Sequence, residues 1–218
     1  MSFGYGGRGG LGKALVLVLG LSGSPALADE VVIAALGDSL TQGYGLPSDQ
    51  GFVPQLEAWL LARGHTVRLI NAGVSGDTTA GGLARIGWTL TDDVDGLIVT
   101  LGGNDLLRGL PPDAARANLS GILQAAEGAG VAVLLVGMQA PLNYGPVYQA
   151  AFDAIYPDLA AEFGTIYAES FLAPVVAAPD MRALMQGDGI HPNAEGVALI
   201  VEALGPQVET LIAQAAQP

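Results

Sequence analysis

A serine, a histidine and an aspartate stand in sequence contexts that could form a nucleophilic site. Ser39 follows a short apolar segment, and Asp188 lies three residues before His191 in a glycine-rich segment. A serine hydroxyl is a weak nucleophile until a neighbouring base accepts its proton, and a carboxylate can hold one imidazole nitrogen while the other faces the serine. Taken alone, the aspartate–histidine pair is also typical of a capped helix start with a surface histidine, and that alternative stays open at this point.

An acyl-transfer site also needs hydrogen-bond donors for the oxygen that becomes negatively charged. The chain offers the backbone N–H of Ser39, the backbone N–H of Gly76 and the side-chain amide of Asn104. Each has a plainer interpretation, because a loop glycine and an asparagine after two glycines often just shape a turn. Their occurrence after successive predicted strands is what favours an oxyanion hole.

Other hydrolytic chemistries find little support in the composition. The chain has no cysteine and only two histidines, His65 and His191, so thiol catalysis is excluded and a zinc hydrolase is disfavoured. Neither a Walker A sequence nor a dinucleotide-binding glycine motif follows the first apolar segment. We therefore expect no metal and no cofactor. His65 follows a glycine between a predicted helix and a predicted strand, where we expect a surface residue that faces away from the site.

The elements that position these residues are predicted from hydrophobic patterning. Short β-branched segments alternate with segments of apolar helical spacing, which indicates a parallel sheet covered on both faces by helices. The predicted strands are 31–36, 66–70, 96–101, 131–138 and 165–167. We expect Trp59 and Trp88 to be core or helix-packing residues, and we expect the tail after Thr210 to fray.

The segments that follow the predicted strands should carry the function, because sites in open α/β sheets lie beyond the carboxyl ends of the strands. Those after the first four strands are rich in glycine and small polar residues, and they are 37–40, 71–77, 102–105 and 139–145. Asp38, Asp77 and Asp105 flank the candidate positions. We interpret all three as carboxylates that brace loops by accepting backbone N–H bonds.

Four further residues are candidates for contact with a substrate, namely Leu106, Arg108, Tyr144 and Ile190. Arg108 follows the asparagine segment and could either steer an anionic head group or pair with a surface carboxylate. Tyr144 and Ile190 could form part of a pocket wall, or they could simply pack their own loops.

The first 28 residues predict a secretory signal peptide that is removed from the mature chain. Arg8 and Lys13 are their only charges, an apolar run over 14–21 follows, and the stretch ends in Ala26-Leu27-Ala28, which is typical of a cleavage site. The apolar run is far shorter than the roughly 20 residues that a membrane-spanning helix needs. We therefore expect an exported protein, periplasmic or secreted, with a retained N-terminal anchor as the alternative.

Residues 29–218 predict a single domain with a sizeable core. Cleavage would remove both N-terminal cations from a chain of net charge −13 and leave −15. Such an acidic surface repels phosphate backbones, so we expect no nucleic-acid partner. No segment after residue 28 reads as long and apolar enough to span a bilayer, so we expect no stable membrane insertion after cleavage.

Four motif blocks occur in order and make the chain resemble the GDSL or SGNH hydrolase family. The blocks are 37–40 with Ser39, 71–77 with Gly76, 103–105 with Asn104, and Asp188-x-x-His191. The resemblance spans residues 31–204 and is nearest to the bacterial periplasmic subfamily of acyl-CoA thioesterases, arylesterases and lysophospholipases. It implies a three-layer α/β/α sandwich with a flavodoxin-like parallel sheet. It also implies that Ser39 is the nucleophile and that Gly76 and Asn104 belong to the oxyanion hole.

The predicted function is serine-dependent hydrolysis of small or lipid-like acyl esters and thioesters through an acyl-enzyme. A carbohydrate O-acetyl esterase is the alternative among enzymes, because the family scaffold also serves the deacetylation of sugars. A non-catalytic binding module on the same scaffold is the alternative from another class. The fold alone does not decide among these three.

Overall fold

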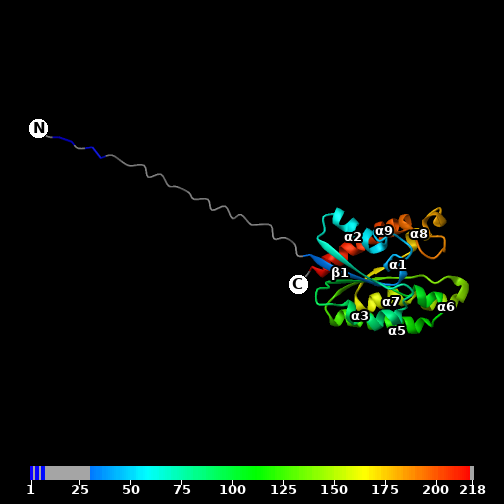
Figure 1. The fold of residues 1–218 in the computed structure, drawn as a ribbon. Helices are drawn as coiled ribbons and strands as arrows, with labels where there is room; N and C mark the ends of the chain where they lie inside the picture. Colours follow the sequence, from blue (N-terminus) through cyan, green and yellow to red (C-terminus); the bar gives the residue numbers. More distant parts are fainter. Residues whose placement is uncertain (2, 5, 8–29, 217–218) are drawn as a thin grey trace.

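The computed structural model describes residues 1, 3–4, 6–7 and 30–216. The predicted signal peptide lies outside the described residues except for five positions near its start, so its cleavage after Ala28 stays a prediction. From residue 30 onward the chain folds around one sheet, which Figure 1 shows edge-on between two layers of helices.

Five parallel strands form the sheet, in the order β2-β1-β3-β4-β5. The strands are β1 (Val31–Gly37), β2 (Val67–Gly73), β3 (Gly96–Thr100), β4 (Ala132–Val136) and β5 (Ile166–Ala168). β1 is buried along its whole length, because it has no polar side chain and helices cover both faces of the sheet. The five predicted strands and the flavodoxin-like order, in which the first strand pairs with the second and the third, are confirmed.

Helices on both faces complete a three-layer α/β/α sandwich, as predicted (Figure 1). α2, α8 and α9 lie on one face, and α3, α5, α6 and α7 lie on the other. The helices are α1 (Ser39–Gln42), α2 (Phe52–Ala62), α3 (Thr79–Thr89), α4 (Gly103–Leu107), α5 (Pro112–Gly128), α6 (Pro146–Asp153), α7 (Ile155–Phe163), α8 (Ala173–Val176) and α9 (Ala194–Ala215), with 3-10 turns η1 (Leu142–Tyr144) and η2 (Met181–Leu184).

The register of the strands brings the carboxyl ends of three neighbouring strands, β2, β1 and β3, to one level. Gly37 at the end of β1 pairs with Gly73 of β2 and with Thr100 of β3. The segments that follow these strands therefore leave the sheet side by side. They are the segments in which the nucleophile and the oxyanion donors are predicted.

α9 differs from two expectations drawn from the sequence. By length and composition it could cross a membrane, contrary to the expectation that no later segment could. One side of α9 packs on β4, β5 and α2, so burial against the sheet accounts for its apolar residues. The helix also continues past Thr210 instead of fraying there, because Leu211 and Ile212 are buried.

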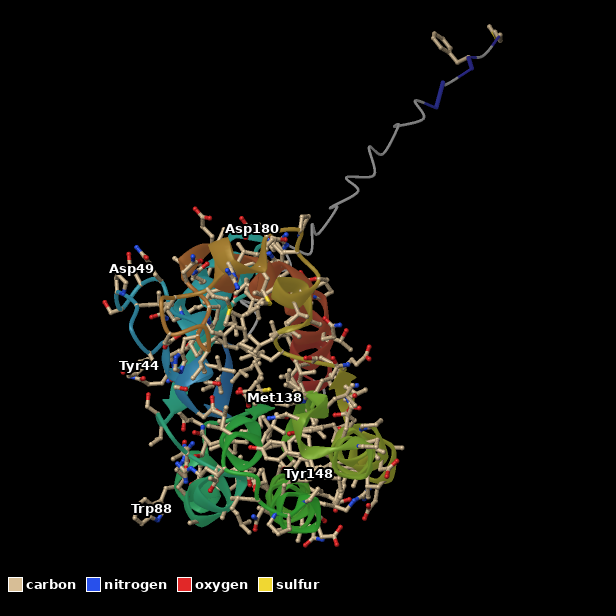
Figure 2. The ribbon with its side chains drawn as sticks, turned by 90° about the vertical axis from the view of Figure 1, so that its right-hand side faces the viewer. Tyr44, Asp49, Trp88, Met138, Tyr148 and Asp180 are labelled. Carbon is tan, nitrogen blue, oxygen red and sulfur yellow. The ribbon has the colours of Figure 1, made fainter. Side chains whose placement is uncertain are left out.

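Only one of the two tryptophans packs as predicted. Trp59 on α2 is half-buried against the core, and a Cβ added to Gly205 of α9 would lie 2.4 Å from its ring. Trp88 on α3 is 88% exposed and points to solvent (Figure 2), so the prediction for it is wrong. Ile86 of the same helix is buried, and two positions further on correspond to about 200° around a helix, which turns Trp88 away from the sheet.

Candidate active site

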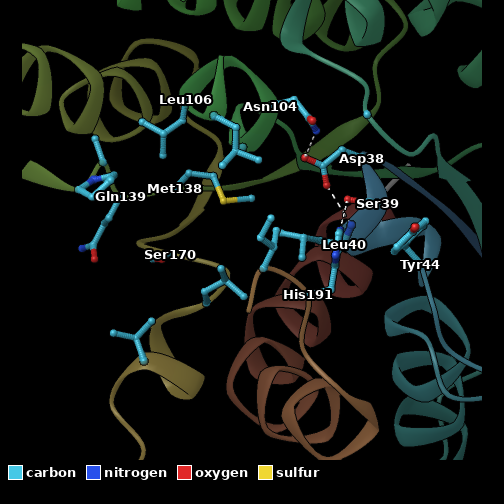
Figure 3. A pocket seen from close by; sticks show the side chains of 18 of the residues that line it. Asp38, Ser39, Leu40, Tyr44, Asn104, Leu106, Met138, Gln139, Ser170 and His191 are labelled. Atoms are coloured by element: carbon cyan, nitrogen blue, oxygen red, sulfur yellow. Dashed lines mark hydrogen bonds between the residues drawn. The ribbon is translucent and has the colours of Figure 1, made fainter. Parts of the chain in front are cut away.

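Ser39, His191 and Asp188 form a continuous chain of hydrogen bonds at the carboxyl edge of the sheet. The Ser39 Oγ lies 2.8 Å from the His191 Nε2 (Figure 3), and the His191 Nδ1 lies 2.7 Å from an Asp188 oxygen. Because an ionised carboxylate only accepts hydrogen bonds, the ring proton belongs on Nδ1, and Nε2 is left to accept from the serine hydroxyl. The arrangement gives the serine proton a base within reach.

Three hydrogen bonds hold the Asp188 carboxylate in place. One oxygen accepts from the imidazole, and the other accepts from the backbone N–H groups of Ile190 at 2.9 Å and His191 at 3.1 Å. The hydrogen bond from the His191 side chain, followed by those from the two N–H groups, lowers the pKa of Asp188 to about 2. Asp188 is therefore ionised at neutral pH and fixes the orientation of the imidazole ring.

A tight turn from β1 into α1 presents Ser39. Asp38 is the N-cap residue, and its carboxylate accepts a hydrogen bond from the Leu40 N–H at 3.0 Å. Gly73 at the end of β2 lies so close to the turn that a Cβ there would come within 2.3 Å of the Gln42 nitrogen. Only glycine allows this approach, so β1 and β2 together hold the serine at the edge of the sheet.

Gln186 ties the histidine segment to the rest of the site. Its N–H donates to the His191 carbonyl at 2.8 Å, and its side-chain amide donates to the carbonyls of Tyr44 at 2.8 Å and Pro192 at 3.0 Å. The Tyr44 and His191 rings lie 4.8 Å apart between centroids. These contacts join the segment before α9 to the segment after α1. They help to fix the distance between a base and a nucleophile that stand 152 residues apart in the chain.

The three predicted oxyanion donors line the pocket that contains Ser39. Ser39 is the first residue of α1, so no earlier helical carbonyl accepts from its N–H. Gly76 adopts a φ of +80°, and its N–H finds no acceptor among the described residues. Asn104 on α4 donates one amide hydrogen to Asp38 at 3.1 Å (Figure 3), which leaves its second amide hydrogen for a ligand.

Asp38 orients the Asn104 amide from a buried position. It is 2% exposed, and burial raises its pKa while the hydrogen bonds from Leu40 and Asn104 act in the opposite direction. His191 also favours the ionised form of Asp38 through its charge. The same attraction stabilises a positive imidazolium, which is the form that His191 takes after accepting a proton.

Two further carboxylates brace the neighbouring segments. Asp105 accepts hydrogen bonds from the N–H of Thr79 at 2.8 Å and from its hydroxyl at 2.6 Å, as predicted. Asp77 pairs instead with a side chain, the Nε of Arg85, at 2.7 Å. The Nη2 of Arg85 donates to the Gly37 carbonyl at the end of β1 at 2.8 Å, and its Nη1 donates to the Ala72 carbonyl near the end of β2 at 2.6 Å. It thereby joins both strand ends to the glycine segment.

An apolar cavity of about 500 Å³ opens beside Ser39, a volume typical of small-molecule sites. Leu106 and Ile190, two of the candidates for substrate contact, line it. Met138, two residues after β4, lines it as well (Figure 3). The remaining apolar walls come from α1, α4, α8 and the segment after β4, and they are Leu40, Leu107, Ala140, Pro141, Leu172, Ala173 and Val176. A hydrocarbon group could therefore lie next to the nucleophile, shielded from water.

Residues 35–199 match the sequence model of the GDSL-like lipase/acylhydrolase family. The chain belongs to this family. The match covers all four motif blocks, so the resemblance inferred from the sequence is confirmed. Membership makes the chain a hydrolase of acyl groups.

This GDSL hydrolase has relatives that match nearly their whole length. Esterase TesA of Pseudomonas aeruginosa is 39% identical over 181 residues, which cover 83% of this chain and 89% of the relative. Thioesterase 1/protease 1/lysophospholipase L1 of Escherichia coli strain K12 is 38% identical over 200 residues, 91% of each chain. The crystal structure of AlinE4, an SGNH-hydrolase family esterase, superposes with a TM-score of 0.71 at 46% identity, covering 85% of this chain and 98% of AlinE4.

Two candidates for substrate contact do not line the pocket of the GDSL hydrolase. Tyr144 packs its ring 5.0 Å from that of Tyr148, and its hydroxyl donates to the Leu107 carbonyl at 3.4 Å. Arg108 donates from Nη2 to the Gly76 carbonyl at 2.7 Å. It pairs with no carboxylate in the described part of the chain, so the surface ion pair considered for it does not form.

Several residues that shape the GDSL site are not marked by any motif or pattern in the sequence. Arg85 and Gln186 hold backbone carbonyls and belong to no motif, and α8 supplies a pocket wall without any periodic pattern. The segment 139–145 was expected to carry function, but its contribution comes from its first residues and not from Tyr144. His65 lies away from the pocket as predicted, where its Nε2 is 2.9 Å from Glu209 of α9.

Proposed function

We propose that this GDSL hydrolase is an exported enzyme that cleaves acyl esters and thioesters, with Ser39 as nucleophile. His191 is the general base, and Asp188 orients it. The observation that carries the proposal is the unbroken chain of hydrogen bonds from the serine hydroxyl to the aspartate, at 2.8 and 2.7 Å. The names of the two relatives, an esterase and a thioesterase/lysophospholipase, support this substrate class.

In the acylation step, Ser39 Oγ attacks the acyl carbonyl carbon while His191 Nε2 accepts the serine proton. The carbonyl oxygen gains negative charge and is stabilised by the N–H groups of Ser39 and Gly76 and by the Asn104 amide. The tetrahedral intermediate then collapses. The alcohol or thiol leaves with the proton from His191, and the acyl group stays on Ser39.

In the deacylation step, water replaces the leaving group. His191 removes a proton from the water molecule as its oxygen attacks the acyl-enzyme, and the same three donors stabilise the second tetrahedral intermediate. Collapse returns the proton to Ser39 Oγ and releases the carboxylic acid. Asp188 stays ionised throughout and stabilises the imidazolium that forms in each step.

The lining of the cavity favours a hydrocarbon acyl group over acetyl. An acetyl group would leave most of a 500 Å³ apolar space unfilled, whereas each methylene group buried there contributes about 0.8 kcal/mol. This lining speaks against the carbohydrate O-acetyl esterase. The aligned Ser39, His191 and Asp188 speak against the non-catalytic binding module, which has no need of a serine hydrogen-bonded to a base.

Hydrolysis of p-nitrophenyl esters from acetyl to palmitoyl by residues 29–218 tests the proposal. The rate should rise with chain length beyond acetyl, and Ser39→Ala or His191→Ala should lower kcat by a factor on the order of 10⁶. Ser120→Ala, on α5 and away from the pocket, is the matched control. An optimum at acetyl would favour the sugar deacetylase. No activity and no labelling of Ser39 by a phosphonate probe, in folded protein, would favour the binding module.

The export of the enzyme is tested separately, on the full chain of 218 residues expressed in a bacterial host. We expect the mature protein outside the cytoplasm with Asp29 as its first residue, as the basic, apolar and Ala-x-Ala regions predict. Intact-mass measurement and N-terminal sequencing of the periplasmic fraction give the answer. An intact N-terminus on a membrane-bound protein would instead favour the retained anchor.

A further inference from the structure

Arg108 carries a positive charge that the protein itself does not neutralise. Most arginines in the described part of the chain pair with a carboxylate, and these are Arg63, Arg68, Arg85 and Arg116. Within the same described residues, Arg108 and Arg182 do not. Residues 29–218 have a net charge of −15, because the whole chain has a charge of −13 and loses two cations with its first 28 residues. An arginine without an anionic partner is therefore unusual on this acidic surface. Arg108 is such a residue, and it lies beside the active site.

The carboxylates nearest to Arg108 along its two neighbouring segments are already engaged. Asp105, three residues before it, is 1% exposed and accepts both hydrogen bonds of Thr79. Asp77, the neighbour of Gly76, is paired with Arg85 at 2.7 Å. The guanidinium of Arg108 consequently has no competing internal anion in either segment.

The hydrogen bond from Arg108 to Gly76 fixes the guanidinium at the rim of the oxyanion hole. The Nη2 donates to the Gly76 carbonyl at 2.7 Å, and both Gly76 and the preceding residues Leu106 and Leu107 line the pocket. A guanidinium has five N–H donors in a planar fork. One is used on Gly76, and the others find no acceptor among the described residues.

The polar lining next to Ser39 indicates a direction for a polar leaving group, since Gln139 and Ser170 line the pocket beside the apolar walls. The acyl chain belongs against the hydrocarbon side chains of α4, α8 and the segment after β4. The leaving group then lies on the side of Ser39 that is lined by Tyr44, Ser75 and Gly76. Arg108 borders this side, and a planar fork of free N–H groups matches the oxygens of a phosphate better than those of a neutral group.

We infer that Arg108 is a specificity-determining residue that binds a phosphate group carried by the leaving group of the acyl substrate. The inference rests on the proposed function, because it assigns a preference among acyl esters and thioesters. Two carriers share this chemistry, namely the phosphorylated thiol of an acyl-CoA and the phosphate of a lysophospholipid. An acidic protein repels both, so a positive charge at the rim selects for them locally.

The test compares pairs of substrates that share the acyl group and the scissile bond, and only one member of each pair carries phosphate in its leaving group. Decanoyl-CoA is paired with decanoyl-N-acetylcysteamine, and decanoyl-lysophosphatidylcholine is paired with monodecanoylglycerol, all below their critical micelle concentrations. The measured quantity is the ratio of kcat/KM within each pair. Any general damage to the oxyanion hole from the lost Gly76 bond lowers both members of a pair, so it cancels in the ratio.

Arg108→Gln should lower the phosphate-to-neutral ratio about tenfold, as expected for loss of one charge-assisted hydrogen bond at an exposed position. Arg108→Lys keeps the charge without the planar fork and should retain part of the preference. Added salt should lower the wild-type ratio relative to that of Arg108→Gln, because salt screens the attraction of phosphate to Arg108 as well as its repulsion by the acidic surface. Arg68→Gln, which removes the same charge at the start of β2, is the matched control and should keep the wild-type ratio.

A shift in either pair supports the inference, and the pair that shifts identifies the carrier of the phosphate. Unchanged ratios in Arg108→Gln, with all four substrates slowed alike, would mean that Arg108 only braces the Gly76 segment and would overturn the inference while leaving the proposed function intact. If the wild type cleaved none of the four substrates, the proposed function and the inference would fail together.

Discussion

Replacing Asn104 tests whether its amide takes part in the chemistry or only closes a turn. In the structure the amide nitrogen donates to the buried carboxylate of Asp38 at 3.1 Å, and this bond leaves the second amide hydrogen for the oxyanion. Asn104→Ala removes both amide hydrogens. Asn104→Asp also removes them but keeps nearly the same side-chain shape, so the two variants together separate shape from hydrogen bonding.

Loss of one oxyanion donor lowers kcat by roughly 10²–10³, or about 2.7–4 kcal/mol, and we expect this loss for Asn104→Ala. In Asn104→Asp a carboxylate would face Asp38 across the 3.1 Å that the hydrogen bond now spans. At an effective dielectric constant of about 20, two charges at that distance repel by about 5 kcal/mol. The two carboxylates should therefore share a proton. That proton bridges them and is not offered to the substrate, so Asn104→Asp should be at least as slow as Asn104→Ala.

The assay is steady-state hydrolysis of p-nitrophenyl hexanoate, with active sites counted by phosphonate titration and folding checked by thermal melts. KM should change little, because the donor acts on charge that develops in the transition state. An Asn104→Asp enzyme as fast as wild type, beside a slow Asn104→Ala enzyme, would mean that the side chain only shapes the turn. That result would refute the assignment of Asn104 to the oxyanion hole.

Four further predictions concern Asp188, Arg85 and two glycines of α3. Asp188→Asn should lower kcat on the order of 10⁴-fold. Because the His191 hydrogen bond and two N–H groups lower the pKa of Asp188 from 3.8 to about 2, its carboxylate stabilises the fold fully above about pH 4. The difference in melting temperature between wild type and Asp188→Asn should therefore shrink as the pH falls toward 2. Gly82→Ala should destabilise the protein by about 1–3 kcal/mol in urea unfolding, since the new Cβ would lie 2.2 Å from the side chain of Leu101, a buried residue just after β3. Gly87→Ala on the same helix has open space and should stabilise by about 0.5–1 kcal/mol. Arg85→Lys keeps its charge but loses its fork, and it should lower kcat at unchanged KM in the p-nitrophenyl assay.

The nucleophile and the oxyanion donors could be placed from the sequence because each follows an apolar, β-branched segment. Parallel strands put their carboxyl ends on one edge, so Ser39, Gly76 and Asn104 had to lie near one another once the strands were recognised. The pairing of Asp188 with His191 was readable from their spacing alone, although the same spacing also fits a capped helix. Only the other motif blocks made the catalytic interpretation the better one.

The supports of the site could not be predicted, because most of their partners are backbone carbonyls. Arg85 and Gln186 bind oxygens that every residue possesses, so no residue type marks the other end of these bonds. The pocket wall formed by α8 could not be predicted either, because a helix of four residues is too short to show a hydrophobic period. Trp88 was placed wrongly because its residue type was given more weight than its position around the helix.

The site depends on side chains from the helices where the sheet can no longer supply hydrogen bonds. Arg85 of α3 holds the end of β1, and the Tyr156 hydroxyl of α7 donates to the Leu101 carbonyl just beyond β3 at 2.9 Å. Burial raises the pKa of Tyr156 well above its usual value, so this hydroxyl stays protonated and remains a donor. Neither bond belongs to the pairing of the strands, so we expect its loss to let the segments carrying Ser39 and Asn104 shift before the sheet itself is affected. Variants that change only the donor group, such as Arg85→Lys and Tyr156→Phe, should therefore lower kcat before they lower the melting temperature, whereas truncations of the apolar core should do the reverse.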